Sequence, residues 1–165
     1  MRNQTLRKVP PMEFGTIERE IHIEASPEVV FEVVSSPQHL REWWPDEATL
    51  DPVPGGVGEL AWRGDEPESL TVVPMTVLRV DAPRLFSFRW GYDAAVAPDP
   101  ANSLLVIFEL TPSGAGTTVR LTETGFREQG WEIALLEATY QDHVEGWGLF
   151  LPRLREYAVR LGSVR

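Results

Sequence analysis

The sequence predicts an α+β fold in which a curved antiparallel sheet of about six strands wraps around one long C-terminal helix. Segments with period-two alternation of apolar residues recur at hairpin spacing through the middle of the chain. The final stretch, from about residue 128 to residue 161, has the apolar period of a helix. An antiparallel sheet with one apolar face needs a cover, and this helix is the largest element that could provide it.

The first strand is predicted over residues 16–24, where three isoleucines alternate with charged and polar side chains. Two short helices should follow, because serine followed by proline at 26–27 and again at 36–37 is typical of a helix start. Pro45 is expected to end the second helix.

Five further strands are predicted as a meander, at about residues 57–62, 69–80, 84–90, 104–110 and 117–125. The strand at 104–110 is apolar on both faces. Its outward residues Leu105 and Ile107 could therefore support a homodimer or a chaperone contact.

Length and charge limit the classes of protein. The 165 residues favour one domain, over residues 16–162, after a flexible leader at 1–15. The net charge of −10, from 15 basic and 25 acidic residues, argues against nucleic-acid binding. Because there is no cysteine, no signal peptide and no run long enough to span a membrane, we expect a cytoplasmic protein without disulfides.

The motifs of several chemistries are missing. The three histidines lie far apart in sequence, so we expect no metal site. The sequence contains no nucleophile elbow, no phosphate-binding loop before a helix and no dinucleotide fingerprint, and we expect no cofactor.

Several segments, in order, resemble the bacterial homologues of the activator of heat-shock protein 90 ATPase. They are "ASPEVVFEVVSSPQHLREWWP", "PVPGGVGELAW", "APRLFSFRW", "GTTVRLTETGF" and "HVEGWGLFLPRLREY". That family belongs to the START-like, or SRPBCC, superfamily of helix-grip folds typified by the birch-pollen allergen. The resemblance implies a pocket between sheet and long helix for an apolar or amphipathic small molecule such as a lipid. Through the family's name it also implies a chaperone partner and a role in stress response.

Glu123 is the most informative ionisable residue. Alternation with Val119 and Leu121 puts it on the face patterned for burial. If buried, it should meet an arginine, lie near a pocket mouth or have a raised pKa, and it would then be a weak candidate for a general acid or base. The favoured interpretation is an exposed strand end, because Gly125 follows two residues later.

His143 lies on the edge of the apolar stripe of the long helix, one turn before Trp147. It could titrate near neutral pH and bind a ligand. The favoured interpretation is a hydrogen-bonded or half-exposed surface histidine.

Gly146 and Gly148 flank Trp147, and Pro152 follows one turn after Gly148. We expect the two glycines to let the helix approach the sheet closely, and the proline to bend the helix near residues 148–152.

Six tryptophans are many for this length, and indole faces could line a wide pocket. The residues expected to contact a ligand are Trp44, Leu60, Trp62, Phe88, Trp90, Phe108, Glu123, His143, Trp147 and Leu151.

Binding of a small apolar or amphipathic molecule without catalysis is the leading hypothesis for function. One alternative is an enzyme of the cyclase or dehydratase kind that uses Glu123 in the same pocket. The other is a module that binds a chaperone, as the resemblance implies.

Overall fold

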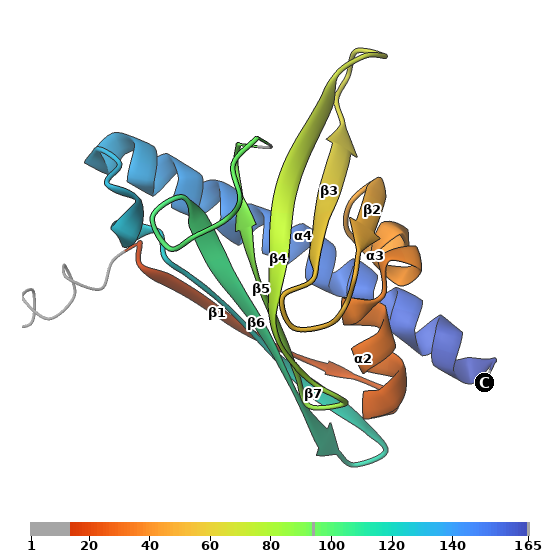
Figure 1. The fold of residues 1–165 in the computed structure, drawn as a ribbon. Coiled ribbons are helices and arrows are strands. Elements are labelled where there is room, and N and C mark those ends of the chain that lie inside the picture. The colour runs from red at the N-terminus through yellow and green to blue at the C-terminus, as the bar shows by residue number, and fades with distance from the viewer. Residues whose placement is uncertain (1–13, 94, 165) are drawn as a thin grey trace, which may run out of the picture.

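The computed structural model describes residues 14–93 and 95–164. Seven antiparallel strands form one sheet, and the described α-helices lie on one of its faces (Figure 1). In chain order the elements are β1 (Thr16–Ile23), α2 (Pro27–Ser35), α3 (Pro37–Trp43), β2 (Glu47–Leu50), β3 (Val57–Arg63), β4 (Leu70–Asp81), β5 (Leu85–Gly91), β6 (Ser103–Ser113), β7 (Gly116–Thr124), the 3₁₀ turn η2 (Arg127–Gln129) and α4 (Ile133–Ser163).

The strands follow the order β1-β7-β6-β5-β4-β3-β2, so β2 to β7 form a meander and β1 joins it beside β7. The register places Glu123 of β7 opposite Val106 of β6 and Ile17 of β1. On β5, Phe88 is opposite Val106, and Trp90 is two residues further along. Since side chains two apart share a face, Trp90 and Glu123 point to the same side of the sheet.

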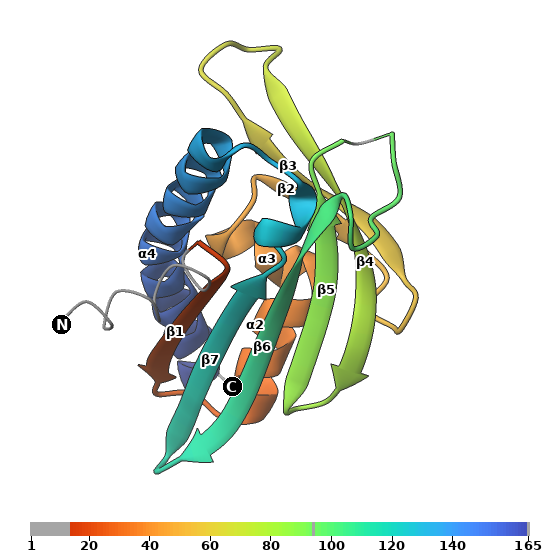
Figure 2. The same ribbon diagram turned by 90° about the vertical axis from the view of Figure 1, so that its left-hand side faces the viewer.

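The long helix α4 runs across the sheet on the side that also carries α2 and α3 (Figure 2). Its buried face includes Trp147, Leu151, Leu154 and Ala158, which confirms the apolar stripe expected from the sequence. The two serine-proline helix starts are also confirmed, and at the first of them the Ser26 hydroxyl accepts a hydrogen bond from the Val29 amide at 3.2 Å. No helix in residues 14–93 or 95–164 has the length and apolar character needed to cross a membrane.

Three details differ from the expectation. The sheet has one strand more than expected, because β2 is only four residues long, too short for its alternation to mark a strand. The long helix begins at Ile133 and not near residue 128, since Gly130 adopts a left-handed conformation with φ of 76° and separates η2 from α4. Residues 1–13 of the expected leader lie outside the described residues, whereas Phe14 packs against Tyr140 with ring centroids 5.5 Å apart.

Leu105 and Ile107 alternate with buried residues of β6 and are half-buried on the opposite face of the strand. The inner residues of the same strand, Val106 and Phe108, are fully buried. The expected two-faced character of this strand is therefore confirmed, while its use by a partner stays a prediction.

The glycines of α4 do not have the role expected of them. A Cβ atom built on Gly146 or Gly148 would meet nothing within 4 Å, so neither glycine is needed for a close approach to the sheet. Helix α4 is one continuous element through Pro152, and the bend expected there stays a prediction.

Replacing Gly148 with alanine is expected to raise the free energy of unfolding by about 1 kcal/mol, because glycine is the weaker helix former and the added methyl group meets open space. Urea denaturation monitored by circular dichroism measures the difference. A loss of stability in this variant would mean that the glycine has a packing role.

Candidate functional site

Glu123 is fully buried on the inner face of β7. The alternation of Val119, Leu121 and Glu123 put it there, so the exposed strand end favoured from the sequence is wrong. Gly125, which suggested that end, has φ of 107° and comes just after the strand. A buried carboxylate must be hydrogen-bonded, and its partners define the site.

Three side chains from two elements, β5 and α4, meet at this carboxylate. The indole Nε1 of Trp147 donates to Oε1 at 2.8 Å, and that of Trp90 donates to Oε2 at 2.9 Å. The Nδ1 atom of His143 lies 3.0 Å from Oε2 and 3.1 Å from Oε1. Of the three outcomes expected for a buried Glu123, the arginine partner is not found in the described part of the chain; two indoles and an imidazole hold the carboxylate instead.

His143 is hydrogen-bonded to Glu123, as one part of the favoured interpretation expected, but with 20% of its side chain exposed it is more buried than a surface histidine. Burial lowers its pKa, but the hydrogen bond and the charge of Glu123, with a smaller effect from Asp142, outweigh burial and raise the pKa above 6.5. The folded protein therefore keeps the imidazole protonated to a higher pH than a histidine with an ordinary pKa.

The raised pKa of His143 predicts a pH-dependent contribution to stability. A folded-state pKa above the unfolded one makes that contribution complete below pH 6.5 and removes it as the pH rises through the folded value. We therefore expect the stability advantage of the wild type over a His143→Gln variant to shrink above pH 6.5. Urea denaturation of both proteins across that range measures it, and an advantage independent of pH would contradict the assignment.

Two clefts open between the sheet and α4, and Val73, Trp90 and His143 line both of them. The first cleft has a volume of about 330 Å³ and is lined in addition by Gly91, Tyr92, Leu104, Trp131, Leu135 and Thr139. The second has a volume of about 280 Å³ and is lined in addition by Trp44, Trp62, Thr71, Asp142, Gly146, Trp147 and Phe150.

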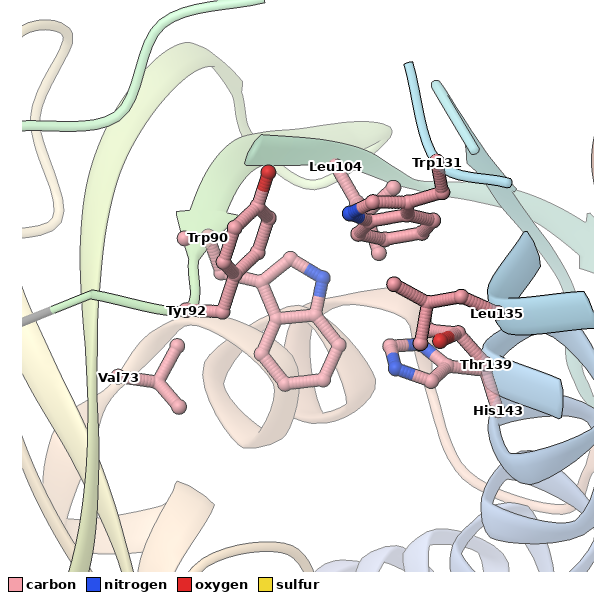
Figure 3. A pocket seen from close by; sticks show the side chains of 9 residues that line it. Val73, Trp90, Tyr92, Leu104, Trp131, Leu135, Thr139 and His143 are labelled. Carbon is pink, nitrogen blue, oxygen red and sulfur yellow. The ribbon is translucent and has the colours of Figure 1, made fainter. Parts of the chain in front are cut away.

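Figure 3 shows the first cleft, in which side chains of the sheet face side chains of α4. The indole of Trp90 lies in the middle of the view and the imidazole of His143 on the side of α4, with ring centroids 5.5 Å apart. These two rings stand between the clefts, and both are held by the same carboxylate.

The structure brings together half of the residues that the sequence suggested for ligand contact. Those that line a cleft are Trp44, Trp62, Trp90, His143 and Trp147. The others are buried and line neither cleft; they are Leu60, Phe88, Phe108, Leu151 and Glu123.

Several cleft residues were not identified from the sequence. Tyr92 follows β5 and Trp131 precedes α4, while Leu135 and Thr139 lie in the first two turns of α4, and no apolar period marks these positions as facing inward. Phe150, at the edge of the helical stripe, was the one with a detectable signal.

Solved structures share this fold. Protein MLL2253 from Mesorhizobium loti is 25% identical, with a TM-score of 0.69 over 88% of this chain and 97% of the other. The Aha1 dimer from Colwellia psychrerythraea is 19% identical, with a TM-score of 0.61 over 86% and 93% of the two chains. DynU16, a protein from the dynemicin biosynthetic locus, is 20% identical, with a TM-score of 0.64 over 87% of this chain and 46% of the other. The last two likenesses show the fold alone.

Among curated proteins, none matches this chain. The family model described as activator of Hsp90 ATPase homolog 1-like protein matches residues 24–158, which is most of the chain and includes Glu123, His143 and Trp147. The match agrees with the resemblance seen in the sequence and with the START-like arrangement of sheet and long helix. The chain therefore belongs to the family of activator of Hsp90 ATPase homolog 1-like proteins.

Proposed function

We propose that this protein binds a small apolar or amphipathic molecule in the two clefts between the sheet and α4, without catalysing a reaction. The observation that carries the proposal is the lining itself: indole faces from β3, β5 and α4 surround open space beside a buried, fully hydrogen-bonded carboxylate. Ligand pockets commonly combine an apolar wall with a few fixed polar groups in this way.

The packing of the indoles supports a preformed site. Trp44 lies 5.0 Å from Trp90 and 5.2 Å from Trp147 between ring centroids, and Trp62 lies 5.8 Å from Trp44. Hydrogen bonds to Glu123 fix two of these rings. A wall that is already ordered loses little side-chain entropy on binding.

The size of the clefts limits the affinity that apolar contact alone can give. Burying roughly 300 Å² of apolar ligand surface contributes about 7 kcal/mol, of which association removes about 4 kcal/mol or more. The remainder corresponds to a dissociation constant in the millimolar range. Tighter binding needs a polar anchor in the clefts as well.

Blocking variants with matched controls test the proposal. The fluorescent apolar probe N-phenylnaphthylamine should bind the wild type. Because Gly146 and Thr139 each line one cleft, Gly146→Leu or Thr139→Phe should weaken binding by about tenfold or more. The controls Gly148→Leu and Ala138→Phe place the same side chains at exposed helix positions outside both clefts, and should bind as the wild type does. Equal affinity in all five proteins, or no binding at all, would overturn the proposal.

The two alternatives have less support. Glu123 lines neither cleft, so its carboxylate could exchange a proton with a molecule there only through His143. The chaperone-binding alternative draws on the family's description and on the half-buried outer residues Leu105 and Ile107 of β6, which would equally serve a homodimer.

A further inference from the structure

We infer that the molecule bound in the clefts is a planar ring system with a carbonyl oxygen, and that this oxygen accepts a hydrogen bond from Nε2 of His143. The inference deepens the function proposed above and rests on it, because it describes the ligand of the same site. It follows from which polar atoms in the clefts already have a hydrogen-bond partner in the protein and which do not.

The Nε2 atom of His143 has no hydrogen-bond partner within the described residues. All hydrogen bonds of this side chain within residues 14–93 and 95–164 run from Nδ1 to Glu123. No buried side-chain nitrogen in that part of the chain is without a partner, so Nε2 is accessible to solvent. The ring lines both clefts, and a molecule in either of them can reach it.

Glu123 determines whether the Nε2 atom of His143 can donate a hydrogen bond. Its oxygens already accept from the indoles of Trp90 and Trp147, which can only donate. When His143 is protonated, one N–H group points to this carboxylate and the other is free to donate into the clefts.

The charged groups around His143 favour that donor state. Glu123 from β7 faces it directly, and Asp142 from α4 lies nearby, and both raise its pKa. The other rings packed against it, Trp90 of β5 and Phe126 after β7, are uncharged. A donor at the centre of the clefts selects a ligand whose polar group is an acceptor.

The other polar groups at the clefts also fit a flat ligand that carries a hydrogen-bond acceptor. The indole nitrogens of Trp44 and Trp62 have no partner among the described residues, yet neither is an unsatisfied buried atom, so both are accessible donors. Asp142 is the acidic residue at the second cleft, and it is exposed to solvent. Indole faces favour stacking with planar rings, which sets the shape of the apolar part.

Two probes of the same shape test the inference. Methyl naphthyl ketone carries a carbonyl oxygen, and isopropenylnaphthalene has a CH₂ group in its place. Because a hydrogen bond from a charged donor distinguishes them, the wild type should bind the ketone about tenfold more tightly below the pKa of His143. The preference should disappear as the pH rises through that pKa, since a neutral imidazole whose Nδ1 donates to Glu123 offers only a lone pair at Nε2.

Variants separate His143 from the other polar groups. His143→Phe should bind both probes equally, while His22→Phe, the same substitution at a histidine that lines neither cleft, should keep the preference. If His143→Phe does not fold, the pH dependence in the wild type decides. Equal binding of both probes at every pH, or a preference that does not change with pH, would overturn the inference and leave the proposed function intact. Absence of binding by either probe would overturn both.

Discussion

Replacing Glu123 with alanine is expected to lower the free energy of unfolding by about 3–5 kcal/mol. The substitution leaves two indole N–H groups and the Nδ1 atom of His143 buried without their common acceptor. Such a loss is a large part of the stability of a domain of this size. Urea denaturation of wild type and variant at one pH measures it.

Glu18→Ala is the matched control, because Glu18 lies on the neighbouring strand β1 but is exposed to solvent. Its ion pair with Arg120 is long, at 3.9 Å, and the change should stay within about 0.5 kcal/mol. If Glu123→Ala cost no more than Glu18→Ala, Glu123 would not be the organising group of the site.

Trp147→Ala is expected to cost about 3–5 kcal/mol, because it empties the space of a large buried ring that packs against Trp44 and Phe108. Trp147→Phe keeps most of the ring but removes the donor to Glu123, and we expect it to cost about 1–3 kcal/mol. The difference between the two variants separates packing from the hydrogen bond.

Trp131→Phe provides the comparison for the hydrogen bond. Trp131 lines the first cleft, and its indole nitrogen has no partner within the described residues. The same substitution there should cost less than about 1 kcal/mol. Equal costs at positions 131 and 147 would mean that the indole bond to Glu123 contributes nothing measurable.

Local patterns in the sequence were enough to predict most of the strands and helices. Period-two alternation identified the inner faces of β1 and β7, and serine-proline pairs marked both short helices. The strand β2 was not predicted because four residues are too few to show a period. The start of α4 was misplaced because the left-handed conformation of Gly130 is not visible in a helical apolar pattern.

The site needed information that a single sequence does not carry. Alternation alone put Glu123 on the buried face, but its partners come from β5 and α4. Pairing Glu123 with Trp90 requires the register of three strands, since Val106 of β6 stands opposite both Glu123 and Phe88. Without that register the sequence left the partner of a buried carboxylate open, with an arginine as one of three possibilities. The sequence placed His143 at the edge of the apolar stripe of the long helix. Whether that edge faces the sheet or solvent depends on how α4 crosses the strands, which the sequence pattern does not tell.

The indole N–H signals in a ¹H–¹⁵N NMR spectrum test small-molecule binding between the sheet and α4 most directly. Trp43 provides an internal reference, because its N–H donates to the carbonyl oxygen of Val33 at 3.0 Å and the ring lines neither cleft. On addition of methyl naphthyl ketone, binding in the clefts predicts large shifts for the cleft-lining tryptophans and little change for Trp43; those tryptophans are Trp44, Trp62, Trp90, Trp131 and Trp147. A spectrum in which no cleft tryptophan moves, or in which Trp43 moves as much as they do, would contradict it.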